Sequence, residues 1–149
     1  MADEATLAAG TVVEYATDLD TPVYVELLGV MGFGAIGEMA EAKERTTLKD
    51  TVKKYGAGMK DSPDKSIKFQ IWALDNKQKA FIAAAIATST LSIKVTYPAP
   101  VGADTGKIAT MEWKLLGFEA DDVSGEDWQM GTINAKQNSI VWTEAVATP

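Results

Sequence analysis

The chain has 149 residues, of which 46% are apolar and 23% charged, so it is globular and fits one domain spanning residues 1–149. It contains no cysteine and no histidine, which excludes disulfides, thiolate chemistry and every histidine-based triad. The net charge of −7 disfavours binding of nucleic acid or anionic lipid over the average surface. No apolar run is long enough to span a membrane, so we expect no membrane association.

The first third of the chain predicts short strands. Residues 1–10 are expected to form a flexible N-terminal arm, and Thr11–Ala16 alternates apolar and polar residues as a strand does. Asp18–Pro22 has the composition of a turn, and Pro22–Leu28 alternates again. This pattern is typical of antiparallel strands with one exposed face.

Residues 32–37 read Gly-Phe-Gly-Ala-Ile-Gly and match the dinucleotide-binding fingerprint, which leaves a nucleotide-binding enzyme as one alternative. That reading requires a buried parallel strand soon afterwards, and Thr46–Lys60 is too polar to supply one. The pattern therefore favours a glycine-rich hairpin or bulge in which two backbones approach closely.

A long loop is predicted at about residues 45–63, where the basic residues of this acidic protein concentrate. It is either a solvated flexible loop or a contact surface for an acidic partner, such as another copy of the chain. The residues expected to make that contact are Arg45, Lys49, Asp50, Lys53, Lys54, Tyr55, Lys60 and Asp61.

The stretch from Lys65 to Pro98 has the clearest pattern, a strand, a helix and a second strand. Asp75 or Asn76 caps a helix over about residues 76–88, and Gln78 occupies the far position of a capping box. Phe81 lies on the main apolar face of this helix. The residues expected to pack the helix against its own sheet or a neighbouring subunit are Phe81, Ile82 and Ile86.

The last part of the chain predicts three more strands. Lys107–Glu119 is long, with a bulge or bend at Gly117. The acidic loop Ala120–Asp127 could bind calcium, but its spacing does not fit an EF-hand and no metal site is expected. Two strands then flank a hairpin turn at Gln137-Asn138. The fold class expected is mainly β, an antiparallel β-sandwich or barrel with one flanking helix and the long loop.

Several motifs in order resemble the major tail tube proteins of bacteriophages with long, non-contractile tails. Glu44-Arg-Thr-Thr-Leu-Lys-Asp50 leads to Gly58-Met-Lys-Asp61, and a strand then precedes a helix that starts Asp75-Asn-Lys-Gln78. Met111-Glu-Trp-Lys-Leu-Leu-Gly-Phe118, followed by Asp121-Asp122, is similar too. The resemblance covers about Pro22 to Trp142, and we expect no additional C-terminal immunoglobulin-like domain.

This resemblance implies a structural virion protein and no enzyme. Subunits would form hexameric rings that stack into a tail tube through which DNA is ejected without specific binding. The family also implies a tape measure protein, a tail terminator and tail tip proteins as partners. The location implied is the virion tail, after assembly in the host cytoplasm. We expect the contact loop to join successive rings, and Glu38, Glu41 and Glu112 to face the lumen, where carboxylates repel DNA.

No cofactor is expected for a tail tube protein. Besides the nucleotide-binding enzyme, two other functions remain as alternatives. The inner tube of a contractile tail or secretion system shares the fold. A monomeric β-sandwich could instead bind sugar on exposed tryptophans, for which the candidates are Trp72, Trp113, Trp128 and Trp142.

Overall fold

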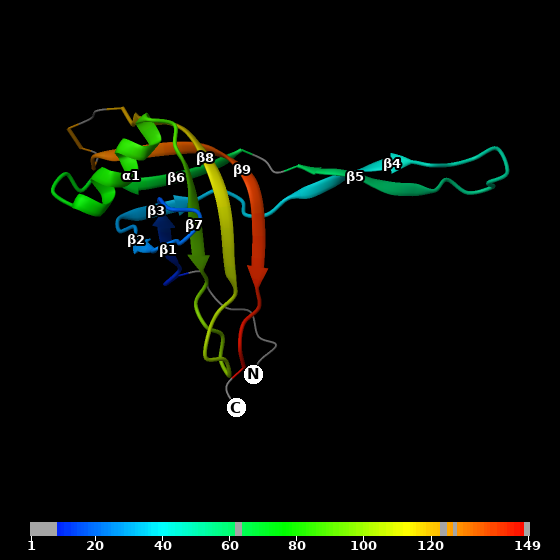
Figure 1. The fold of residues 1–149 in the computed structure, drawn as a ribbon, viewed down its shortest axis with the longest axis horizontal. Helices are drawn as coiled ribbons and strands as arrows, with labels where there is room; N and C mark the ends of the chain where they lie inside the picture. The colour runs from blue at the N-terminus through cyan, green and yellow to red at the C-terminus, as the bar shows by residue number, and fades with distance from the viewer. Residues whose placement is uncertain (1–8, 62–63, 123–124, 127, 148–149) are drawn as a thin grey trace.

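The computed structural model describes residues 9–61, 64–122, 125–126 and 128–147, and these form nine strands and one helix (Figure 1). In chain order the elements are β1 (Val12–Ala16), β2 (Val25–Glu26), β3 (Val30–Phe33), β4 (Met39–Glu44), β5 (Tyr55–Asp61), β6 (Lys65–Gln70), α1 (Asn76–Ile86), β7 (Thr90–Thr96), β8 (Ile108–Ala120) and β9 (Met130–Thr143). Seven strands form one antiparallel sheet in the order β2-β1-β7-β8-β9-β6-β3, and β4 pairs with β5 alone. The prediction of a mainly β antiparallel fold with one helix is confirmed.

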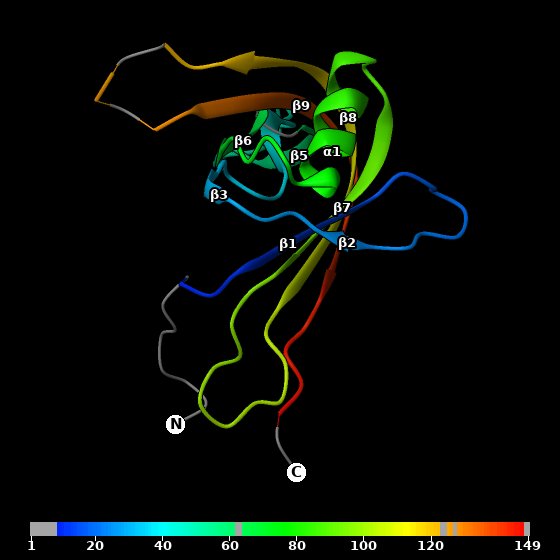
Figure 2. The same cartoon turned by 90° about the vertical axis from the view of Figure 1, so that its left-hand side faces the viewer.

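The large sheet curls because its two longest strands, β8 and β9, change partners along their length (Figure 2). One half of β8 pairs with β7, whereas the opposite half of β9 pairs with β6. Two register shifts separate these halves, one next to Gly117 and one beside Asn138. Each shift inserts an extra residue, which bends the strand.

The bulge predicted at Gly117 is confirmed, and its φ of 144° is one that glycine adopts without strain. The hairpin predicted at Gln137-Asn138 is wrong, because β9 continues through both residues. Gln137 pairs with Trp113 and Ser139 with Glu112, so Asn138 is the extra residue of a bulge.

The hydrophobic core lies on one face of the curled sheet, where every second side chain is buried. Trp113 is fully buried, and its ring centroid lies 5.2 Å from that of Phe33. The other fully buried core side chains of β6 to β9 are Ile67, Phe69, Leu91, Ile93, Val95, Ala109, Met111, Leu115, Ile133 and Ala135. This alternation was predicted for β6, β7 and β8, whereas only Val25–Glu26 of the predicted strand at residues 22–28 forms a ladder.

Helix α1 closes over the core. Asp75 caps it as predicted, accepting a hydrogen bond from the Lys77 amide at 3.0 Å. Phe81 and Ala85 are fully buried, and the Phe81 ring lies 5.1 Å from that of Tyr15. The helix ends at Ile86, two residues earlier than the sequence predicted.

The capping box predicted at Gln78 does not form, because this side chain turns into the core and is 1% exposed. Its carbonyl accepts a hydrogen bond from the Trp72 amide at 2.7 Å, and its amide nitrogen donates to the Gln70 carbonyl at 2.7 Å. Gln78 therefore joins the first turn of α1 to the end of β6, where strand pairing leaves backbone groups to be satisfied.

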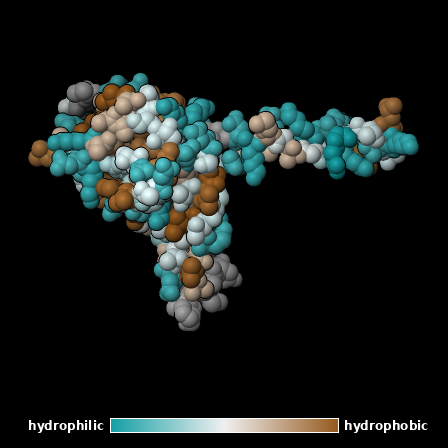
Figure 3. All heavy atoms as spheres, in the orientation of Figure 1, coloured by the Kyte–Doolittle hydropathy of each residue, from teal (hydrophilic) through white to brown (hydrophobic). Residues whose placement is uncertain are grey.

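Strands β4 and β5 form a projecting hairpin, residues 39–61, which extends far from the sheet (Figure 1). All six residues of β4 are exposed, and its surface is polar along most of its length (Figure 3). The loop predicted at residues 45–63 is therefore wrong for Tyr55–Asp61, which form β5 and pair with β4. Residues 62–63 lie outside the described part of the chain.

Candidate functional site

The tip of the projecting hairpin, residues 45–54, is a locally bonded turn. The Arg45 amide donates to the Lys54 carbonyl at 2.8 Å, and the Thr46 hydroxyl accepts from the Lys54 amide at 2.9 Å. The Asp50 carboxylate accepts from the Thr47 amide at 2.8 Å and lies 3.1 Å from the Lys54 ammonium. The Thr47 amide, and after it Lys54, hold the pKa of Asp50 below its usual range. Asp50 thus shapes the turn.

The predicted contact residues fall into two groups. Five lie in the tip, which carries four basic side chains and one carboxylate: Arg45, Lys49, Asp50, Lys53 and Lys54. Tyr55 follows directly and is 55% exposed. Lys60 and Asp61 instead lie at the other end of the hairpin, opposite Ala40 and Met39.

Sequence reasoning missed two apolar members of the tip. Leu48 and Val52 are 106% and 71% exposed, respectively, between the basic residues. The sequence did contain a sign of this surface. Leu48 and Val52 stand among polar and charged residues, where no neighbour in the sequence could bury them. The tip therefore combines positive charge with exposed apolar surface, which is typical of a protein contact.

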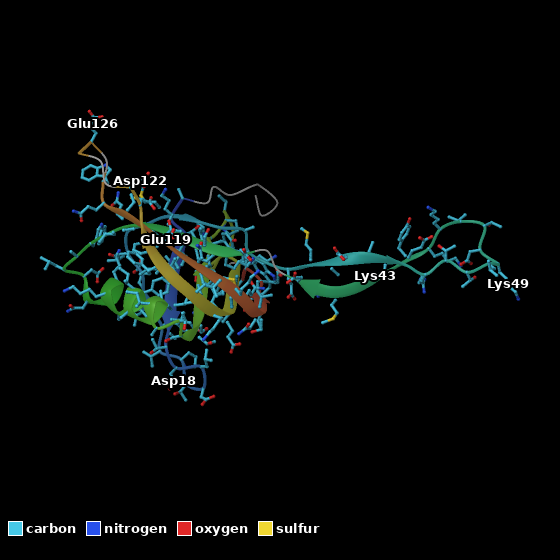
Figure 4. All side chains as sticks on the ribbon, turned by 90° about the horizontal axis from the view of Figure 1, so that it is seen from above. Asp18, Lys43, Lys49, Glu119, Asp122 and Glu126 are labelled. Carbon is cyan, nitrogen blue, oxygen red and sulfur yellow. The ribbon has the colours of Figure 1, made fainter. Side chains whose placement is uncertain are left out.

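Carboxylates gather at the far end of the molecule from this tip. Figure 4 shows Glu119 near the end of β8, and Asp122 and Glu126 on the turn between β8 and β9, at the opposite end of the long axis from Lys49. Asp121 in the same turn pairs with Lys68 at 3.0 Å. Among the described residues, no group of carboxylates is arranged to hold a metal ion, and Asp127 of the acidic loop at residues 120–127 lies outside them.

The face of the sheet opposite the core is polar and carries Glu112. In the cross-strand rows on this face, Ser92 pairs with Glu112, and Lys94 pairs with Thr110. Lys94 lies over the Tyr24 ring, 5.2 Å from its centroid. Two further lysines of this face are also engaged, Lys114 with the Thr88 carbonyl and Lys136 with the Asp64 carboxylate.

The three predicted lumenal carboxylates do not share one surface. Glu112 is half-buried on the polar sheet face, whereas Glu38 and Glu41 belong to the projecting hairpin and the segment leading into it. Of the helix residues predicted to pack, Phe81 is buried in its own subunit and Ile82 packs partly against the core. Ile86 remains 66% exposed.

The glycine fingerprint at residues 32–37 does not form a nucleotide-binding turn. Gly32 lies in β3, and the chain continues into β4 rather than a helix. A Cβ atom on Gly34 would lie 3.2 Å from the Ser66 hydroxyl, so glycine permits close approach of two backbones there. The predicted bulge is present as a register shift between Val30 and Gly32.

The tryptophans do not support a sugar-binding platform as a group. Trp113 is fully buried in the core, and Trp142 is 39% exposed beneath the Lys107 ammonium, which lies 4.9 Å from its ring centroid. Trp72 and Trp128 are 42% and 81% exposed on separate connections, after β6 and before β9.

Solved structures with a similar fold are components of tubes and injection machines. A chain of the SPP1 tail tube has 11% sequence identity and a TM-score of 0.70, over 93% of this chain and 78% of that chain. A chain of an extracellular contractile injection system, in its extended sheath–tube complex, has 7% identity and a TM-score of 0.71, over 95% and 93%. A chain of the six-fold symmetrised anti-feeding prophage baseplate has 6% identity and a TM-score of 0.71, over 95% and 97%.

At these identities the similarity shows the fold alone. The sequence identifies the protein family, because residues 6–145 match the phage tail tube protein family. The chain belongs to this family and is a structural subunit of a phage tail tube. No curated protein matches it. Within the described residues, no helix is long and apolar enough to cross a membrane.

Proposed function

We propose that copies of this chain close into hexameric rings, that the rings stack through the projecting hairpin, and that DNA is ejected through the lumen. One observation carries the proposal. The hairpin leaves the sheet and exposes apolar side chains, with Met39 and Met59 82% and 93% exposed. An isolated two-stranded hairpin is marginally stable in water, so contact with another subunit would stabilise it. The six-fold symmetry of the anti-feeding prophage baseplate, which has this fold, supports six subunits.

The charge distribution supports a head-to-tail contact. The basic tip lies at one end of the long axis and Glu119, Asp122 and Glu126 lie at the other (Figure 4). A contact between two different surfaces of the same chain repeats without limit along an axis. We propose that the tip of a subunit in one ring meets these carboxylates on the next ring, with Leu48 and Val52 buried between them.

Charge reversal tests this contact. Lys49→Glu with Lys53→Glu should stop ring stacking, since carboxylates would then face carboxylates. Glu119→Lys with Asp122→Lys should stop it as well, and mixing the two variants should restore mixed tubes. The measurement is tube length by electron microscopy, and Lys77→Glu with Lys79→Glu, which changes net charge equally on exposed positions, is the control. Normal tubes from the first variant would exclude the contact.

The lumen surface we propose is the polar sheet face that carries Glu112. Each of its lysines has a nearby partner, namely Tyr24, the Thr88 carbonyl, Asp64 or Asp121, so their positive charge is partly offset by neighbouring groups. DNA would then meet a surface without a free basic stripe and could slide.

Glu112→Lys should therefore slow DNA ejection while tubes still assemble, because each copy adds a cation along the path. Real-time release of DNA from particles measures the effect, and Asp20→Lys on an exposed turn is the control. Glu38→Lys and Glu41→Lys test the other two predicted lumenal residues in the same assay. Ejection at the normal rate from Glu112→Lys particles would place Glu112 outside the lumen.

Negative-stain microscopy and light scattering of the purified chain test the whole proposal, with rings or tubes as the expected result. A monodisperse monomer at high concentration would contradict it.

The inner tube of a contractile machine is the second candidate, supported by the injection-system chains with this fold, and a sheath around the tube in particles would identify it. The partners we propose are the tape measure, terminator and tip proteins, met in the host cytoplasm during assembly before the subunit enters the virion tail.

A further inference from the structure

Lys65 is a charged side chain that is fully buried, although it is the first residue of β6. It points to the core face of the sheet together with Ile67 and Phe69, and both of those are fully buried as well. A buried ammonium requires hydrogen-bond acceptors, since burial removes its water. Lysine is rarely fully buried unless it is paired, so its position calls for a specific partner.

The partners are two backbone carbonyls in the segment that connects β3 to the projecting hairpin. The Lys65 ammonium donates to the Ala35 carbonyl at 2.6 Å and to the Gly37 carbonyl at 3.0 Å. Backbone pairing to β6 reaches only Gly34, whose amide donates to the Ser66 carbonyl at 2.9 Å. The Lys65 side chain thus continues the attachment of this segment beyond the last backbone hydrogen bond.

Lys65 also lies where the chain re-enters the sheet after the hairpin. The chain comes back from β5 and enters β6 at Lys65 itself, directly after Asp64. Asp64 pairs with Lys136 of β9, but both of these side chains are largely exposed, so water and salt weaken that ion pair. Lys65 is therefore the buried connection between the outgoing and returning sides of the hairpin at its base.

Electrostatics agree with this geometry. Burial lowers the pKa of Lys65, whereas the nearby carboxylate of Glu38, the residue before β4, opposes that shift. Glu38, which is also one of the carboxylates predicted to face the lumen, thus places a negative charge near the ammonium that holds the hairpin base.

We propose that Lys65 is the positioning residue of the projecting hairpin, fixing the direction in which the hairpin leaves the sheet so that its tip can reach another copy. The hairpin projects away from the body of the subunit (Figure 1), so contacts at its base set its direction. A small rotation at the base moves the distant tip by a large displacement. The consequence for stacking rests on the proposed function, whereas the fixed direction is a property of the single subunit.

The direct test measures the distance between the tip and the sheet. The chain has no cysteine, so Thr51→Cys and Ser139→Cys give two unique sites for spin labels outside the proposed contact residues, and tube growth is measured on the same Lys65 and Lys68 variants without the labels. Both positions are exposed, one at the tip and one on β9. Diluting labelled protein tenfold or more with unlabelled protein leaves only distances within one subunit. Lys65→Met keeps the side-chain length and removes all donors, Lys65→Gln keeps one amide donor group, and Lys68→Met on the same strand is the control.

We expect one narrow distance distribution for the unsubstituted labelled chain and for Lys68→Met. Lys65→Met should give a distribution at least twice as broad, with at least tenfold slower tube growth. Should Lys65→Met fail to fold, Lys65→Gln is measured instead, and broadening by a smaller factor is expected. A distribution as narrow as that of the control in the folded variant would overturn the inference, even if tubes form normally. Absence of tubes from the unsubstituted chain would instead count against the proposed function, and the distance measurement would still decide the role of Lys65.

Discussion

A chain in which residues 43–56 are replaced by Asn-Gly should fold and yet form no tubes. Ala42 pairs with Ala57, so a two-residue turn can join the shortened strands. The deleted residues lie outside the hydrophobic core cluster, so the free energy of unfolding should change by no more than about 1 kcal/mol. Tube length under the electron microscope and sedimentation velocity measure assembly, while thermal unfolding measures the fold.

The deletion has a matched control in the full-length hairpin. Thr51→Ser changes one exposed residue of the tip and should leave both tube length and stability unchanged. Tubes of normal length from the shortened chain would show that stacking uses another surface. A loss of folding would show that the hairpin stabilises the sheet, contrary to its exposure.

Phe81→Ala should lower the free energy of unfolding by about 3–5 kcal/mol, because it empties a fully buried site and leaves a cavity. Phe81 contacts Tyr15, whose hydroxyl donates to the Lys77 carbonyl at 2.6 Å, so the loss should also loosen α1 from β1. For a chain of this size, a decrease in the melting temperature of roughly 10 °C is expected. Thermal and urea unfolding measure the change, and a decrease below about 1 kcal/mol would contradict the packing described.

Ile86→Ala is the matched comparison on the same helix. Ile86 is 66% exposed, so its truncation should change the stability of the free subunit by no more than about 0.5 kcal/mol. If the helix contacts a neighbouring subunit, as we predict, the same substitution should weaken rings while leaving the monomer intact. Equal ring stability for Ile86→Ala and the unsubstituted chain would show that Ile86 is not part of the interface.

The sequence predicted the strand, helix and strand between Lys65 and Pro98 because each element buries one face. Alternation at β6 and β7 and the Asp75 cap are local signals, and the structure agrees with them. The projecting hairpin gave a signal on one side only. Ala35–Glu44, which contains β4, is predicted as a strand that leads into a long loop. On the returning side, Gly56 and Gly58 lower the strand propensity of β5.

The second error, at Gln137-Asn138, has a different cause. Polar residues that favour turns are also accepted at a bulge, and only the partner strand decides between the two. Lys65 was predictable in part, because strand alternation already places it on the face of Ile67 and Phe69. The carbonyls that it binds come from another part of the chain, and no local pattern indicates them. The same holds for Gln78, whose partners belong to the fold rather than to its helix.

The order of strands in the sheet also affects how fast the subunit folds and can join a tube. Val12 pairs with Thr96, and Lys65 pairs with Ala135, so the ladders on either side of the central strands β7, β8 and β9 join segments that are distant in the sequence. Loops of this kind must close before their contacts stabilise anything, and such topologies fold in milliseconds to seconds rather than microseconds. The projecting hairpin, by contrast, is built from neighbouring residues and can form within roughly 10 µs. Because a hairpin that forms before the sheet is only marginally stable, folding of the sheet would set the pace at which subunits can join.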